Sequence, residues 1–325
     1  MLVLQAIVEG ILVGGFYALM GAGLTLVFGV MDIVNFAQGA LVVLGAYLSY
    51  ALSVHLNIDP FIGLIVTMPA MALLGVAIYW VLIKPIKRDR VVMSLLTMFA
   101  VATLIEGVLD LVFNSNLVQV HAAYVNDSIQ LGEITIPLIY LYSFLLSAVL
   151  LGGLQLLTYR TKFGRSLRAS MQNPVAARLV GIDTDRVSAI TLGIGIGLAA
   201  AGGMIFSTTN AFNAASSYDL ISRLLVIVIL GGFGSVGGAL VAAIFMITIQ
   251  DVVAVVWSPV WGQTVFYAAL IIVLLVRPQG LFGRRLATFE EGEQRVGVLS
   301  GIPVLGLDAL GSAAYGPEAA LTLLI

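Results

Sequence analysis

The chain has 325 residues, of which 60% are hydrophobic and 10% are charged, and its mean hydropathy is +1.09. This composition excludes an ordinary soluble domain and predicts an all-α polytopic membrane protein. The formal net charge is −2 and the basic residues lie between apolar segments, so no nucleic-acid partner is expected. The absence of Cys excludes disulfides and Cys-bound metals, and two His residues supply a histidine metal site poorly, so no metal is expected.

A bilayer core about 30 Å thick needs roughly 20 apolar residues per helix, and this length identifies the membrane spans. About eight transmembrane segments are predicted, in chain order 4–28, 36–55, 61–83, 91–113, 137–158, 187–208, 224–257 and 263–276. The first segment lacks a basic region before it and a clear small-residue cleavage site after it. We therefore interpret it as a retained span and not as a signal peptide.

Basic residues assign the two faces of the membrane. Fourteen of the 15 Lys and Arg residues fall in the segments 84–90, 159–186 and 277–295. Because cytoplasmic loops carry an excess of Lys and Arg, these three segments are predicted to be cytoplasmic. Segment 114–136 contains no Lys or Arg and is predicted to be external, and 209–223 is the next external segment.

Two places interrupt the apolar pattern. The run 224–257 is too long for one ordinary helix and contains GGFGSVGG at 231–238. External residue 223 and cytoplasmic Arg277 must also be separated by an odd number of membrane crossings. A single helix over 224–257, followed by the helix over 263–276, would give two. The second interruption, VMDIVNFAQGA at 30–40, contains three polar side chains. We therefore expect broken or re-entrant helices near 30–40 and 231–238.

Helix breaks at membrane depth occur where protein or a water-filled cavity satisfies the backbone, and paired breaks are typical of transporters. The candidate residues of a translocation pathway are Asn35, Gln38, Glu106, Gly231, Gly232, Gly234 and Ser235. Asn35 and Gln38 either line this pathway or join two membrane helices through hydrogen bonds. Glu106 either faces a cavity or reaches water at the external end of its span.

Glycines are frequent in segment 187–208, which contains Gly193, Gly195, Gly197, Gly202 and Gly203. Small residues on one helix face predict close helix packing. The sequence GIGIG is not a dinucleotide fingerprint, because it lies inside an apolar span without the required strand. No GxxxxGK[ST] sequence occurs, so any ATP use belongs to another chain.

The basic segment 159–186 contains a short predicted helix. Asn173 is a suitable N-cap, Pro174 fits the first helical position, and Gly181 can end the helix. A helix this short is unstable alone. It is either suited to dock in a groove of a partner protein or belongs to a solvated cytoplasmic loop.

Four stretches, at 17–47, 163–182, 230–243 and 273–283, resemble the permease subunits of branched-chain amino acid ABC importers of the LivH type. The resemblance extends from residue 1 to about 285 and implies an importer permease transmembrane domain over 1–285. It implies a multi-pass protein of the prokaryotic plasma (inner) membrane. Many relatives carry His and Glu where this chain has Gln38 and Ala40, which leaves the pathway role of that segment open.

The resemblance also implies partners. A second homologous permease subunit, two cytoplasmic ABC ATPases and an external substrate-binding protein complete such an importer, and ATP acts on the ATPases. The residues of the coupling helix at 163–182, which docks on the ATPase, are then Gly164, Arg165, Arg168, Asn173, Pro174, Ala177 and Gly181.

The C-terminal region 286–325 does not fit this family. It consists of a charged linker with TFEEGEQR and an atypical tail, and 301–325 resembles the start of an amino acid–polyamine–organocation permease. The match is too short to form a transporter, and no role is predicted for this region.

Other functions stay open at the level of sequence. Related ABC permeases import urea or short amides. A gradient-driven channel or secondary carrier is a rival from another class, and it needs no ATPase-docking helix. An enzyme is not expected, because no nucleophile and base pair, metal set or HExxH motif is visible.

Overall fold

The computed structural model describes residues 2–125, 127–131, 134–276 and 280, and the predicted linker and tail at 286–325 lie outside this part. Its helices are α1 Leu2–Met31, α2 Gln38–Leu56, α3 Pro60–Ile78 with the π-helix η1 Tyr79–Ile83, α4 Arg90–Phe113, the short 3-10 helix η2 Ala123–Val125, α5 Leu138–Arg160, α6 Lys162–Gln172, α7 Pro174–Leu179, α8 Thr184–Thr209, α9 Ser216–Gly231, α10 Val236–Val256 and α11 Pro259–Val276. Strands β1 Ser128–Leu131 and β2 Ile134–Pro137 form an antiparallel hairpin.

Seven helices of the described residues are long and apolar enough to cross a membrane: α1, α2, α3 with η1, α4, α5, α8 and α10. Helix α11 is also apolar but is shorter over the searched range, and α9 has 16 residues. These elements confirm the all-α polytopic membrane fold.

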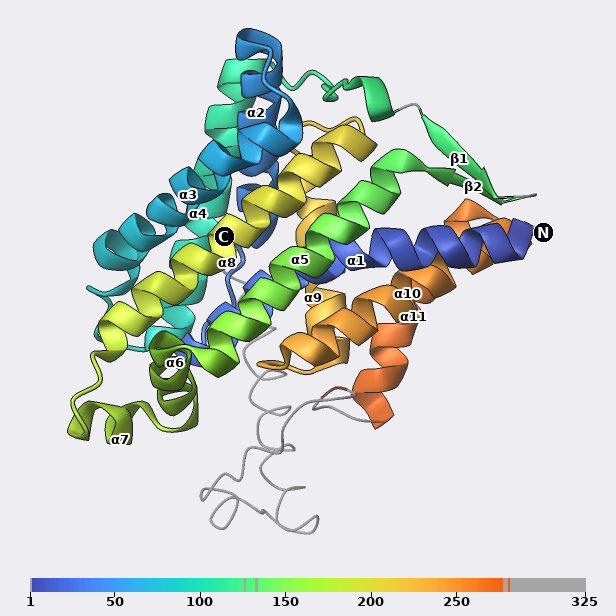
Figure 1. The fold of residues 1–325 in the computed structure, drawn as a ribbon. Helices are drawn as coiled ribbons and strands as arrows, with labels where there is room; N and C mark the ends of the chain where they lie inside the picture. The colour runs from blue at the N-terminus through green and yellow to red at the C-terminus, as the bar shows by residue number, and fades with distance from the viewer. Residues whose placement is uncertain (1, 126, 132–133, 277–279, 281–325) are drawn as a thin grey trace, which may run out of the picture. The chain divides into compact units, whose positions relative to one another are not determined.

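Helices α1 and α8 form the centre of the bundle and are mostly buried, whereas α4 and α5 are mostly exposed at its outside (Figure 1). Helix α1 packs along α10, and α8 contacts α1, α2 and α3. Small residues bring these helices close together, since a methyl group on Gly45 of α2 would lie 2.6 Å from the Ala200 Cα of α8. The close packing predicted from the glycines of 187–208 is confirmed by Gly193, which faces α3, and by Gly195, which faces α1.

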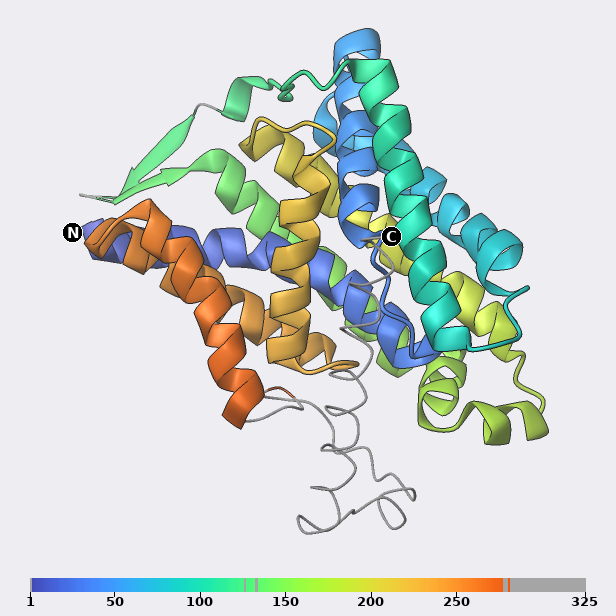
Figure 2. The same cartoon turned by 180° about the vertical axis from the view of Figure 1, so that it is seen from behind.

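The two faces of the membrane are marked by different elements. Helices α6 and α7, in the basic segment 159–186, lie together at one end of the bundle, and the β1–β2 hairpin lies toward the other end (Figure 2). The loop before η2 also pairs with the loop after α8, through the bridge between Val118 and Phe212. Both of these loops belong to the face that was predicted to be external.

One predicted boundary is wrong. The segment 209–223 was expected to be an external loop, but α9 begins at Ser216 and includes Arg223. The helix tolerates this charge because the Arg223 Nε donates to Asp219 Oδ2 at 2.8 Å, one helical turn earlier. The run 224–257 is divided between α9 and α10, as its length and glycines predicted.

Candidate functional site

Helix α6 is fixed against the C-terminal end of α5, on the face predicted to be cytoplasmic. Gly164 lies in the first turn of α6, where any side chain would collide with the carbonyl oxygens of Leu157 and Thr158. The Arg168 Nη1 donates a hydrogen bond to the Thr158 carbonyl and so satisfies a carbonyl at the end of α5. Leu167 is fully buried, whereas Arg165 is exposed. Helix α6 therefore holds Arg168 inward and leaves Arg165 toward solvent.

Helix α7 has the local structure predicted for it. The Asn173 Oδ1 accepts hydrogen bonds from the backbone N–H groups of Val175 and Ala176, at 3.0 and 2.9 Å. Pro174 occupies the first helical position, and the helix ends before Gly181, which has a φ of 85°. The predicted coupling segment therefore consists of two helices, α6 and α7, that meet at Asn173.

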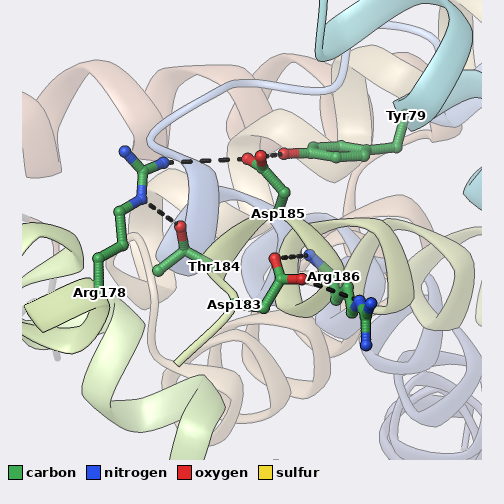
Figure 3. A network of polar contacts seen from close by, with 6 residues as sticks. All are labelled: Tyr79, Arg178, Asp183, Thr184, Asp185 and Arg186. Atoms are coloured by element: carbon green, nitrogen blue, oxygen red, sulfur yellow. Dashed lines mark hydrogen bonds and ion pairs between the residues drawn. The ribbon is translucent and has the colours of Figure 1, made fainter. Parts of the chain in front are cut away.

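A polar network joins α7 to the first turn of α8 and to η1 at the end of α3 (Figure 3). The Arg178 Nε donates to the Thr184 Oγ1 at 2.6 Å, and the Arg178 Nη2 lies 3.9 Å from the Asp185 Oδ1. The same Asp185 oxygen accepts a hydrogen bond from the Tyr79 hydroxyl at 3.0 Å. Movement of α7 can therefore reach α8 directly and η1 through Asp185.

The α7 surface, defined as Val175, Leu179 and Val180, is apolar and faces outward. These side chains are 65%, 83% and 76% exposed, whereas Ala177 is buried against the bundle. Exposed apolar side chains at the end of a short helix that the rest of the bundle holds in place are typical of an interaction site. Ala177 and Arg178 connect α7 to the rest of the protein.

The break between α1 and α2 is an irregular segment, residues 32–37, that begins at the exposed Asp32 and is otherwise buried or half-buried. Asn35 and Gln38 are buried, and the Asn35 Nδ2 donates to the Gln38 Oε1 at 3.0 Å. The Gln38 Nε2 reaches the carbonyl oxygens of Met20 and Gly195, at 3.4 and 3.5 Å. These contacts join α1, α2 and α8, so the polar groups of this break have partners within the protein.

The break between α9 and α10 is a tight turn. Gly232 and Gly234 have positive φ angles of 85° and 78°, which favour glycine. A side chain on Gly231 would lie 2.5 Å from the backbone nitrogen of Ala239, so the two helices cross backbone to backbone. The Ser235 Oγ accepts from the Gly238 N–H at 3.0 Å and caps α10. Both predicted helix breaks are therefore confirmed as breaks.

The candidate residues fall into separate places. Arg168 and Met171 of α6 share a cavity of about 280 Å³ with Gly234 and Ser235. Gln38 does not line this cavity and contacts Met20 and Gly195 instead. Glu106 lies on α4 beside the Tyr218 hydroxyl of α9. The turn after α9 thus adjoins the predicted coupling helices, and the other candidate pathway residues lie elsewhere.

Several candidate functional residues were not identified from the sequence. Tyr79, Arg178 and Asp185 meet only through the fold. Arg223 and Asp251 had a signal in the sequence, because Arg223 is the one basic residue outside the three basic segments and Asp251 interrupts the apolar run 224–257. Within the part of the chain that the structure describes, no group of three or more His, Cys, Asp or Glu side chains could hold a metal ion.

Comparison with known proteins agrees with this architecture. The family model described as branched-chain amino acid transport system / permease component matches residues 6–275. The high-affinity branched-chain amino acid transport system permease protein LivH of Escherichia coli K12 is 29% identical over 304 residues, covering 86% of this chain and 96% of the relative.

Two further relatives have similar coverage. The BraD permease protein of Pseudomonas aeruginosa is 24% identical over 294 residues, covering 86% of this chain and 96% of its own. A probable LivH of Methanocaldococcus jannaschii is 28% identical over 293 residues, covering 86% and 92%. No solved structure matches the chain. The chain belongs to the permease component family of branched-chain amino acid transport systems, and it is a transport protein, not an enzyme.

Proposed function

We propose that this chain is the permease subunit of an ATP-driven importer for branched-chain or related amino acids, in the plasma (inner) membrane of a prokaryotic cell. A second homologous permease, two cytoplasmic ABC ATPases and an external substrate-binding protein complete the assembly. ATP acts on the ATPases, so this chain needs no cofactor of its own. The names of the relatives and their coverage support the substrate class.

The α7 surface is the observation that supports ATPase docking. Val175, Leu179 and Val180 are exposed on the positively charged face, where an ATPase is accessible. Arg178 connects this surface to Thr184 and Asp185 on α8. Docking on α7 therefore gives an ATPase a mechanical connection to the membrane helices, and we propose α6 and α7 as the coupling element.

Capture of candidate ABC ATPases by the tagged full chain tests this proposal. Leu179→Ser removes the most exposed apolar side chain of the α7 surface. Burying a Leu contributes about 1.5–3 kcal/mol, so the affinity for the ATPase falls roughly ten- to hundredfold. The captured amount of ATPase, at equal amounts of inserted permease, measures this change.

Leu117→Ser is the matched control, because Leu117 is 70% exposed and lies in the loop on the opposite face. We expect this variant to capture as much ATPase as the wild type. Equal capture by Leu179→Ser would place the docking surface elsewhere, and no capture by the wild type would contradict the importer proposal.

A gradient-driven carrier is the second candidate, because Asp219, Arg223 and Asp251 line a cavity within the membrane helices. Ionisable groups at such positions are typical of coupling-ion pathways. The pathway role of Asn35, Gln38, Glu106 and the turn at 231–235 stays a prediction. The described contacts of Gln38 support a role in joining helices at least as well.

A further inference from the structure

A cavity of about 400 Å³ lies among α1, α5, α8, α9 and α10. Its volume is at the lower end of the roughly 300–1,000 Å³ that small-molecule sites occupy. Thr209, Asn210 and Ala211, at the end of α8 that faces away from the basic segments, form part of its wall. The cavity therefore belongs to the external half of the bundle, where a substrate arrives first.

A buried cation forms one side of this cavity. The Arg223 side chain is 12% exposed, its Nε donates to Asp219 Oδ2 at 2.8 Å, and its Nη1 donates to Gln250 Oε1 at 3.0 Å. A guanidinium has five N–H donors, and these two contacts leave donors on both terminal nitrogens. A carboxylate in the cavity can accept from them in the paired geometry that Arg favours.

An anion without a hydrogen-bond or ion-pair partner among the described residues forms another side. Asp251 of α10 is half-buried and lines the cavity, and no described residue forms an ion pair or hydrogen bond with its carboxylate. A carboxylate within a membrane helix is costly unless a cation or polar group compensates it. An ammonium group in the cavity supplies that cation.

Another part of the wall is apolar and includes Val13, Phe16, Phe206 and Ile247. A cation, an anion and an apolar wall together match the three groups of an aliphatic amino acid. Resting on the proposed import function, we propose that the cavity is a binding site for a zwitterionic amino acid with an aliphatic side chain. Arg223 binds the carboxylate, Asp251 binds the ammonium group, and the apolar wall receives the side chain.

Binding of labelled leucine to the full chain in nanodiscs, assembled with its partner membrane chains and ATPases and without the external binding protein, tests this site. Competing probes are 4-methylpentanoate, which lacks the ammonium group, and 3-methylbutylamine, which lacks the carboxylate. Asp251→Asn is expected to weaken leucine binding about tenfold or more and to leave 4-methylpentanoate binding unchanged or stronger. Asp251→Glu keeps the charge and is expected to retain most of the leucine affinity.

The matched control is Asp110→Asn, which removes a carboxylate that accepts a hydrogen bond from Ser115 outside the cavity. This variant is expected to bind all probes like the wild type. Unchanged leucine affinity in Asp251→Asn, or equal losses for leucine and 4-methylpentanoate, would overturn the proposed site. The importer proposal survives that result if the α7 variants behave as described. If no ATPase is captured, leucine binding is measured with the full chain alone in nanodiscs, so the two proposals fail separately.

Discussion

Two tyrosine–aspartate hydrogen bonds lie at opposite faces of the bundle. The Tyr79 hydroxyl donates to Asp185 Oδ1 at 3.0 Å beside α7, and the Tyr124 hydroxyl donates to Asp59 Oδ2 at 2.9 Å in the loops predicted to be external. Burial and the neighbouring Asp59 carboxylate raise the pKa of Tyr124, so its hydroxyl stays protonated and continues to donate. The two bonds have the same chemistry, but Tyr79 alone of the two connects to the proposed docking helix.

We expect Tyr79→Phe to weaken coupling without preventing assembly. The substitution removes one charge-assisted hydrogen bond, worth about 1.5–3 kcal/mol, and leaves the α7 surface intact. The ATPase is therefore captured normally, but less leucine is imported per ATP hydrolysed. Parallel measurement of uptake and ATP hydrolysis in the assembled importer gives this ratio.

Tyr124→Phe is the control for this prediction, because it removes an equivalent bond far from α7. Its ratio of uptake to hydrolysis should equal that of the wild type. A Tyr79→Phe importer with an unchanged ratio would show that the network of Tyr79, Asp185 and Arg178 does not transmit coupling.

Residue-level prediction succeeds where the determining chemistry is local. The cap of Asn173, the position of Pro174 and the end at Gly181 depend on a few neighbouring residues, and the sequence was sufficient for them. Tyr79 and Asp185 are 106 positions apart, so no local pattern indicates that they meet. Arg223 was assigned to a loop because charged residues are typical of loops between membrane spans. Its hydrogen-bond partner Gln250 lies on another helix, so no local pattern indicated that the charge has a partner within the bundle.

The α9–α10 hairpin is the element that departs most from a simple membrane span. Helix α9 has 16 residues and α10 has 21, which correspond to about 24 and 31 Å at the helical rise. Phe233 in the turn packs against Phe28 of α1, with ring centroids 4.2 Å apart. The cavity beside this turn is shared with α6, so the turn adjoins the face predicted to be cytoplasmic.

Single introduced cysteines test this placement without removing native ones, since the chain has no Cys. A membrane-impermeant maleimide should label Leu117→Cys and Trp257→Cys in intact cells, because both residues lie between helices on the external face. Phe233→Cys and Val175→Cys should react only after the cells are opened. Labelling of Phe233→Cys in intact cells would contradict a turn at the cytoplasmic face.

Element boundaries could be predicted where apolar runs end in polar or charged residues, as at the ends of α4 and α5. They could not be predicted around α9, because hydropathy alone assigns Asp219 and Arg223 to a loop. The ion pair between these residues makes a charged helical turn acceptable, and it depends on a helical geometry that hydropathy does not detect. The irregular segment 32–37 was expected as a break, and its polar residues marked its position.

At the scale of the whole molecule, the three helices after residue 215 agree with the odd number of crossings predicted before Arg277. Helices α9, α10 and α11 connect the external loop after α8 to the basic C-terminal segment. The basic residues indicated that the hydropathy pattern lacked one membrane crossing after residue 223. The glycines at 231–238 indicated that the run 224–257 is divided there into two helices. Packing around α1 and α8 was foreseeable only in part, because small residues identify a close contact but not its partner.

ATP-dependent uptake by the reconstituted assembly tests the central claim most directly. Proteoliposomes containing this chain, its partner permease and the ATPases, supplied with the external binding protein, should accumulate labelled leucine when ATP is present on the ATPase side. Vesicles without ATP, or with this chain alone, should not accumulate it. Uptake by this chain alone along an imposed gradient, at a rate that ATP and the ATPases do not change, would contradict the importer account and favour a carrier.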